Sequence, residues 1–310
     1  MKALLTSTTA LAALFSGVLS AADPQLLNLV MPDVKVMADI NVAQAKTSPF
    51  GQYVLAQVET QQLQQMSTLA GFDPTKDVSE LLVAGNGVAE HGLALAAGNF
   101  KVDTITGFVA LQKMPTEVYR GITILEDPKK HGGLAFLSGS LAAAGDVASV
   151  KAAIDRLSSP SILPASLMVQ IGQLSAANDA WALTTVPPSS LKPPSGAPAV
   201  PGVGNAGQNV LGNVLSASGG VKFGTNVVFT AQAQADTAQN AAAMTNLIQF
   251  MVNMAQMQAA QEPQVQALAK ALTVNADGAT VSLSLSLPST QFQELLQGKG
   301  QAHHTAHPPR

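Results

Sequence analysis

The sequence predicts an α+β fold of two similar lobes, each an antiparallel sheet with helices packed on one face. Short strand-like segments alternate with amphipathic helical segments along the 310 residues. The order strand, helix, hairpin, helix, hairpin, helix occurs twice, and several hairpin turns contain glycine. The repeated order predicts an internal duplication, although the two halves share few residues.

The first lobe is expected to span residues 23–160. Ser48 and Pro49 mark the start of a helix, as an N-cap followed by a first helical residue. Asp146 is expected to cap the last helix of the lobe. The expected elements, in order, are a strand Val34–Val42, a helix from Pro49, strands Leu81–Ala84 and Leu93–Gly98, a helix Asp103–Leu111, strands Gly121–Leu125, Leu134–Leu137 and Leu141–Ala144, and a helix Val147–Leu157.

The second lobe is expected to span residues 161–297, and residues 298–310 are expected to form a disordered tail. Asp277-Gly278 is a strong hairpin signal, and Asp236 or Thr237 is expected to cap a long helix. The expected elements, in order, are a strand Ala180–Val186, a helix Asn209–Ser216, strands Gly220–Phe223 and Asn226–Ala235, the long helix, a helix from Pro263, strands Leu272–Asn275 and Ala279–Leu287, and a helix after Ser289.

The N-terminus has the pattern of a cleavable secretory signal over residues 1–22. Lys2 supplies a positive charge, the stretch Ala3–Leu19 is apolar, and Ser20 and Ala22 are small residues at the −3 and −1 positions. The apolar run is short for a membrane span, although an uncleaved anchor helix is the alternative. The sequence therefore predicts a periplasmic or secreted protein without stable membrane insertion after cleavage.

A glycine-rich stretch, PGVGNAGQNVLG, has the spacing of a dinucleotide-binding loop at Gly202, Gly204 and Gly207. That loop requires a strand that leads into a helix, but VPPSSLKPPSGAPAVP precedes it, and proline disfavours a strand. We therefore interpret residues 187–207 as a linker or surface loop, and no cofactor is predicted.

Composition and the remaining motifs predict no catalytic or metal site. The chain has no cysteine, carries a formal net charge of −3, and has no basic cluster that would suit nucleic acid. Ser189–Lys192 fits an S-x-x-K pattern but lies in the proline-rich loop. Asp73 is expected to cap a turn, and the histidines are expected in turns and in the tail.

One helical segment has features of a partner surface. Thr237–Ala260 contains methionine and aliphatic side chains at helical spacing, and methionine is common where a surface adapts to varied partners. The alternative is that the same stripe packs on its own sheet. The candidate residues for an unknown protein or ligand partner are Met244, Ile248, Met251 and Met254.

A resemblance adds to this interpretation. The signal peptide together with LLNLVMPDVKVMADINVAQAKTSPFGQYVL, GFDPTKDVSELLVAG and AAGDVASVKAAIDRL resembles a group of uncharacterised exported proteins from acidobacteria and related bacteria. The resemblance covers most of the mature chain and implies a whole-chain fold. It implies no activity.

Two functions remain open from the sequence. The favoured one is an exported non-enzymatic protein that binds a protein or another ligand in the cell envelope. The alternative is a secreted or periplasmic hydrolase whose active site is dispersed along the chain. Acidic groups that converge near Asp39, Asp103 or Asp179 would favour the hydrolase.

Overall fold

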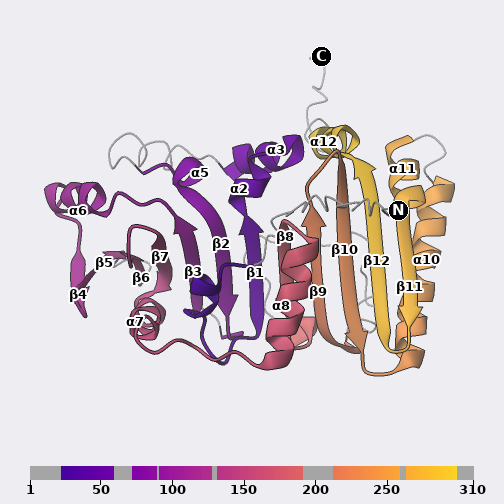
Figure 1. The fold of residues 1–310 in the computed structure, drawn as a ribbon. Coiled ribbons are helices and arrows are strands. Elements are labelled where there is room, and N and C mark those ends of the chain that lie inside the picture. Colours follow the sequence, from indigo (N-terminus) through magenta and orange to yellow (C-terminus); the bar gives the residue numbers. More distant parts are fainter. Residues whose placement is uncertain are drawn as a thin grey trace, which may run out of the picture.

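The computed structural model describes residues 22–58, 72–88, 91–127, 131–190, 212–258 and 263–298. The strands in these ranges form one twelve-stranded antiparallel sheet with helices against it (Figure 1). The prediction of an α+β fold with antiparallel strands is therefore confirmed. The expectation of a separate sheet in each lobe is wrong, because strands from both halves pair with each other in the middle of the sheet.

The first half supplies seven of the strands. Strand β4 was not expected, and β5 begins one residue later than predicted. The elements are α1 (Pro24–Leu27), β1 (Val36–Asn41), α2 (Val42–Ala45), α3 (Pro49–Val58), α5 (Pro74–Asp77), β2 (Val78–Gly85), β3 (Gly92–Gly98), α6 (Val102–Leu111), β4 (Thr116–Tyr119), β5 (Ile122–Asp127), β6 (Gly132–Phe136), β7 (Leu141–Asp146) and α7 (Val147–Arg156).

The second half supplies the other five strands. Residues 214–216 belong to a strand, which contradicts the helix expected over Asn209–Ser216, and helix α8 was not expected. The elements are α8 (Ala165–Ala177), β8 (Ala180–Thr184), the 3-10 helix η1 (Pro188–Ser190), β9 (Val214–Lys222), β10 (Asn226–Ala235), α10 (Ala238–Gln258), α11 (Pro263–Ala271), β11 (Leu272–Asp277), β12 (Thr280–Pro288) and α12 (Ser289–Gly298).

Helix caps occur where the sequence predicted them. Ser48 Oγ accepts a hydrogen bond from the Gly51 amide at 2.9 Å, and Asp146 Oδ1 accepts one from the Ser149 amide at 2.9 Å. Thr237 Oγ1 accepts a bond from the Asn240 amide at 3.1 Å at the start of α10. These bonds satisfy amide groups that a helix N-terminus leaves without partners.

The two halves meet where β1 pairs with β8. The register runs from Val36 opposite Thr184 to Ile40 opposite Ala180. From this junction outward, the strands are β1-β2-β3-β7-β6 on one side and β8-β9-β10-β12-β11 on the other. The first half then adds β5 and β4 at its edge. The two halves therefore follow the same order from the centre, each with one crossover.

The core lies on both faces of the sheet. On the face toward the viewer in Figure 1, α7 and α8 pack with residues near α1 over the first half and the junction. The opposite face carries α6 over the first half and α10 over the second. Buried side chains on the first face include Leu26, Met37, Leu82, Leu95, Ile171 and Trp181.

Candidate functional site

Two carboxylic side chains converge on the covered face near the junction. Asp39 lies on β1 directly opposite Trp181 of β8, and Glu80 lies on β2 opposite Asn41. Asp39 and Asn41 are two residues apart on one strand and point to the same face, which places Glu80 diagonally next to Asp39. Asp39 is 8% exposed. This is the acidic convergence at Asp39 that the sequence raised as a possibility.

The acid pair lies in a closed polar pocket. Glu80 Oε1 accepts a hydrogen bond from the Asp23 backbone amide at 2.8 Å. Asp39 Oδ2 and Trp181 Nε1 are buried and have no well-aligned hydrogen-bond partner among the described residues. The space leaves no room for a water molecule. It is lined by Ala22, Asp39, Asn41, Glu80, Ser175, Asn178 and Trp181.

Burial perturbs both acids. Loss of solvent raises the pKa of Asp39 to about 8, and the negative charge and hydrogen bond of Glu80 act in the same direction. The nearby Trp181 indole opposes this by lowering the pKa of Asp39. Burial also raises the pKa of Glu80, against the lowering effect of the amide bond from Asp23. The pair therefore retains a proton at neutral pH.

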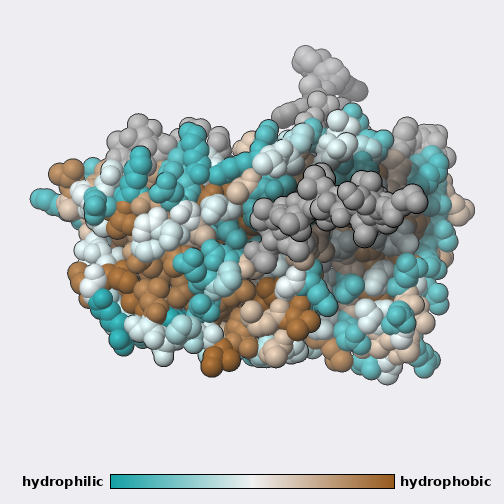
Figure 2. All heavy atoms as spheres, in the orientation of Figure 1, coloured by the Kyte–Doolittle hydropathy of each residue, from teal (hydrophilic) through white to brown (hydrophobic). Residues whose placement is uncertain are grey.

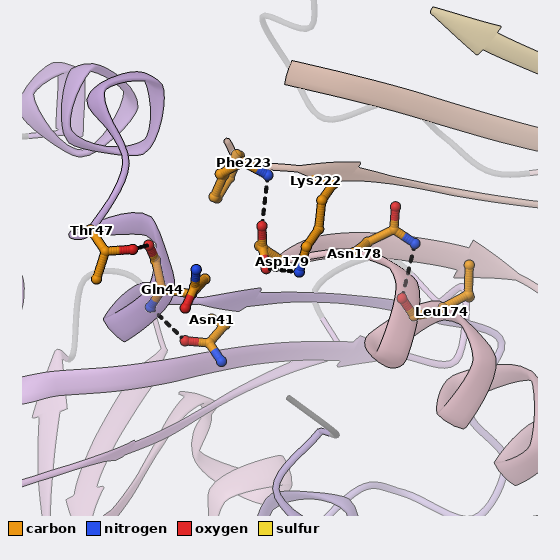
Figure 3. A network of polar contacts seen from close by, with 8 residues as sticks. All are labelled: Asn41, Gln44, Thr47, Leu174, Asn178, Asp179, Lys222 and Phe223. Atoms are coloured by element: carbon orange, nitrogen blue, oxygen red, sulfur yellow. Dashed lines mark hydrogen bonds and ion pairs between the residues drawn. The ribbon is translucent and has the colours of Figure 1, made fainter. Parts of the chain in front are cut away.

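A second buried acid fixes the same region from the other half (Figure 3). The Asp179 side chain is fully buried and accepts bonds of 2.6 Å from Lys222 Nζ and from the Phe223 amide. Its carbonyl oxygen accepts a bond of 2.8 Å from the Asn41 amide. Asp179 thus links β1, β8 and β9, and both of its carboxylate oxygens are occupied. This arrangement indicates a structural role.

Asn178 and Gly220 explain how the end of α8 packs against β9. Asn178 Nδ2 donates to the Leu174 carbonyl at 2.9 Å, and its Oδ1 accepts a bond from Thr230 Oγ1 at 3.3 Å. A Cβ atom on Gly220 would lie 2.3 Å from Asn178 Cγ. Glycine at this position is therefore required for the amide side chain to lie across β9 and hold the end of α8.

The acid pair does not form an accessible catalytic site in this structure. Paired carboxylic acids with separated pKa values can act as a general acid and base. A substrate must reach them, however, and α1, α8 and the sheet enclose the pair without space for a water molecule. No group of three or more metal-ligating His, Asp or Glu side chains occurs in the described part of the chain.

An apolar cavity of about 430 Å³ lies between α6 and the outer strands of the first half. Most of its wall consists of aromatic and aliphatic side chains, and Glu126 and Asp127 at the end of β5 also line it. By the β5–β6 register, Asp127 lies on the α6 side of the sheet with Leu125, and Glu126 lies on the α7 side. Its apolar lining comprises Phe72, Ile105, Phe108, Val109, Met114, Leu125, Leu134 and Phe136. Its size is within the range typical of small-molecule sites.

A second hollow of about 500 Å³ lies over the middle of the same face. It is more open than the α6 cavity and spans the junction between the halves, where Val83 of β2 is exposed. Side chains that point to this face include Ala38, Ile40, Leu81, Val83, Ala180, Val221 and Phe229. Among the described residues, none from α6 or α10 lines this hollow.

The structure separates the four methionine-helix candidates. Met244 is 5% exposed and packs in the core against the sheet, and Ile248 lies against the same cluster. Met251 and Met254 are 39% and 42% exposed. Met244 therefore cannot contribute to a partner surface in this conformation, while Met251 and Met254 remain accessible beside Phe250 and Met257.

The other residues considered from the sequence do not lie at the Asp39–Glu80 pair. Asp103 is exposed in the first turn of α6. Asp73 Oδ1 accepts bonds from the Thr75 amide and hydroxyl, as expected of a cap. His91 Nδ1 is 3.8 Å from Asp146 Oδ2, and His131 lies in a turn. Lys192, the glycines at 202, 204 and 207, and the histidines of the tail lie outside the described residues.

Sequence reasoning missed Glu80 as the partner of Asp39, and it missed both apolar hollows. The sequence pattern predicts strands that contain Asp39 and Glu80, but it does not predict how the two strands align. Only the register of β1 against β2 brings the two side chains together. The lining of the α6 cavity comes from five segments, so no local pattern could reveal it.

The chain was compared with known proteins. No protein-family model matches it, and no curated protein matches it. Two crystal structures of TP0453 are similar to it over nearly the whole chain. Form III has 10% identity and a TM-score of 0.56, covering 90% of this chain and 99% of the other. Form I has 9% identity and a TM-score of 0.52, covering 90% and 98%. This similarity, at such low identity, establishes a shared fold and nothing about activity.

Proposed function

We propose that this chain is an exported, non-enzymatic protein of the cell envelope that binds an apolar small molecule in the α6 cavity. The observation that carries the proposal is the cavity of about 430 Å³, whose wall is almost entirely apolar. Burial of apolar ligand surface in such a wall contributes about 25 cal/mol per Å². A ligand that fills the cavity would therefore gain affinity mainly from the hydrophobic effect.

The rim of the cavity narrows the class of ligand. Glu126 and Asp127 lie at the edge of the apolar lining and also line a neighbouring polar depression that includes His131 and Asp146. Of the two, only Asp127 lies on the α6 side of the sheet, and an acidic residue there disfavours an anionic head group by charge repulsion. The ligand we propose has an apolar body and a neutral or cationic polar end.

Export and duplication are part of the same proposal. Export rests on the signal pattern over residues 1–22, and the resemblance to exported acidobacterial proteins agrees with it. In the described ranges, no helix has both the length and the apolar character needed to cross a membrane. Duplication is supported by the matching strand order on either side of the β1–β8 junction.

The binding proposal is tested with a neutral apolar fluorophore, N-phenyl-1-naphthylamine, titrated into the purified chain. We expect saturable binding, and we expect Phe108→Glu to weaken it by tenfold or more, because the new carboxylate would lie among apolar side chains. Leu111→Glu, three residues along α6, is the control, because Leu111 is 81% exposed and does not line the cavity.

The result has two clear outcomes. Saturable binding that Phe108→Glu weakens and Leu111→Glu preserves supports the α6 cavity as the site. Binding that is non-saturable, or that both variants leave unchanged, contradicts it. Thermal unfolding of both variants shows that the fold is retained before binding is compared.

Two alternative functions are each supported by one specific observation. A protein partner at α10 is favoured by the exposed Met251 and Met254. A hydrolase is favoured by the Asp39–Glu80 pair and the raised pKa of Asp39. Turnover of ester, peptide or glycoside substrates that Asp39→Asn abolishes would replace the binding proposal with the hydrolase.

A further inference from the structure

The described chain begins directly on top of the acid pair. Ala22 is 5% exposed and lines the closed pocket together with Asp39 and Glu80. The nitrogen atom of Asp23 lies 2.8 Å from Glu80 Oε1. The sequence places the expected signal cleavage between these same two residues, Ala22 and Asp23.

The position of the Asp23 nitrogen is fixed by the residues that follow it. Asp23 Oδ1 accepts a hydrogen bond from the Gln25 amide at 2.8 Å, and the Asp23 carbonyl accepts bonds from the Leu26 and Leu27 amides. Leu26 and Leu27 are buried in the core below. The contacts of Asp23 with the α1 turn therefore hold this nitrogen at the pocket.

The residues that line the pocket are of the kinds that bind a cation, and no positively charged side chain is among them. Its lining residues provide two carboxyl groups, two side-chain amides and a hydroxyl, and none of them is a lysine or arginine. Asp39 is more than nine-tenths buried, and its Oδ2 has no well-aligned partner among the residues described. A buried carboxyl group with an unsatisfied oxygen is costly unless a donor or a positive charge reaches it.

We propose that the Asp39–Glu80 pocket is the binding site for the amino terminus that signal cleavage creates at Asp23. The inference rests on the export that we propose above. Hydrolysis of the Ala22–Asp23 bond by a signal peptidase consumes one water molecule. It leaves a carboxylate on Ala22 of the released leader and an ammonium group on Asp23.

Cleavage changes the chemistry of this nitrogen without moving it. Before cleavage it is a neutral amide with one N–H, which Glu80 accepts. After cleavage it is an ammonium with three N–H donors and a positive charge, and the departure of Ala22 opens space beside Asp39. One donor stays on Glu80, and the others can serve Asp39. Export would thus complete a buried ion pair that locks α1 onto the sheet.

The experiment compares three forms of the chain that differ only at the N-terminus. One begins at Asp23 with a free amine, one begins at Asp23 with an acetyl group, and one begins at Ala22. We expect the free Asp23 form to have the highest Tm and an unfolding equilibrium constant at least tenfold lower than the acetylated form. The acetyl group removes the charge and two donors but leaves every other contact in place.

Substitutions then locate the effect. Glu80→Gln should abolish the Tm difference between the free and acetylated forms, and Asp39→Asn should reduce it. Glu294→Gln, an exposed acid on α12, should leave the difference intact. The acylation rate of the Asp23 amine provides a second measurement that does not depend on a variant. We expect this rate to be at least tenfold slower in the folded chain than in a peptide of residues 23–30.

Three results would overturn the inference. These are equal stability of the free and acetylated forms, a difference that persists in Glu80→Gln, or an Asp23 amine that reacts as fast as the peptide. Mature protein from native cells that begins at a residue other than Asp23 would also overturn it. Ligand binding in the α6 cavity is a separate readout, so failure here is distinguishable from failure of the proposed ligand site.

Discussion

The two halves of the sheet follow one strand order but are covered differently. In the first half, α7 and the α1 region pack on one face and α6 packs on the other. In the second half, α10 packs on one face. On the other face, which we call the open face, α8 packs over β8 and β9, and the strands beyond it present hydroxyl and amide side chains. In Figure 2, the hydrophobic residues on the viewer's face gather mainly over the lower part of the first half. Among the described residues, the same strand order therefore carries helices on both faces in the first half and mainly on one face in the second.

The strand sequences follow this difference. β12 reads TVSLSLSLP, with serine toward the open face and leucine or valine toward α10. β3 reads GLALAAG and β7 reads LAAAGD, with apolar residues on both faces. Strict alternation is typical of a sheet with one solvated face, and continuous apolar runs are typical of strands covered on both.

A large loss of stability is expected from a truncation in the core of the first half. Leu95 of β3 is fully buried, so Leu95→Ala should reduce the free energy of unfolding by about 3 kcal/mol, because it removes apolar contacts and leaves a cavity. Ser284→Ala on the open face of β12 should change it by less than about 0.5 kcal/mol. Urea unfolding of both variants measures the contrast. Equal losses at the two positions would mean that the open face is covered in solution.

The sequence predicted the secondary structure of this molecule better than its assembly. The strand patterns at Leu272–Asp277 and Thr280–Pro288 and the Asp277-Gly278 turn between them correctly identified the β11–β12 hairpin, with Gly278 at φ +54°. The helix expected over Asn209–Ser216 failed because small residues in VLSASGGVK weaken the strand pattern. That segment is a strand because it pairs with β8 on one side and β10 on the other.

The single sheet and the acid pair could not be predicted, for a common reason. Both depend on pairing between segments that are distant in sequence, namely Val36–Asn41 with Ala180–Thr184 and with Val78–Gly85. Hydrophobic periodicity indicates which side of a strand is buried but not which strand lies next to it. Helix α8 is different, because Leu167, Ile171 and Leu174 have helical spacing and could have been recognised.

A second difference between the halves concerns pH. Burial raises the pKa of Asp39 in the folded chain to about 8, from an ordinary value of 3.8. The folded state then binds more protons than the unfolded state between these values, so this group's contribution to stability falls as pH rises through that window. The slope has an upper limit of about 1.4 kcal/mol per pH unit for one proton.

Asp39→Asn, made in the chain that begins at Ala22, tests whether the raised pKa of Asp39 causes this decline in stability. The neutral amide cannot ionise, so the variant should lose most of the decline in stability between pH 5 and pH 8. Asp277→Asn, at the exposed end of β11 in the second half, should keep the decline. Thermal unfolding across this pH range provides the measurement. If stability depends on pH in the same way in Asp39→Asn as in the unsubstituted chain, the raised pKa of Asp39 is refuted.

A comparison of Met251 with Met244 separates the two faces of α10 and tests the partner surface. Met251 is 39% exposed, so Met251→Glu should lower the free energy of unfolding by about 1 kcal/mol or less, because the new carboxylate can remain in water. Met244→Glu, on the same helix, should cost several kcal/mol, because Met244 packs against the sheet and the charge would be buried. Thermal unfolding distinguishes the two.

If α10 binds a protein partner, Met251→Glu should also abolish the complex formed by the wild-type chain while the fold stays cooperative. A complex that survives Met251→Glu and Met254→Glu together would place the partner elsewhere, and a large loss of stability in Met251→Glu would show that this side of α10 is also covered.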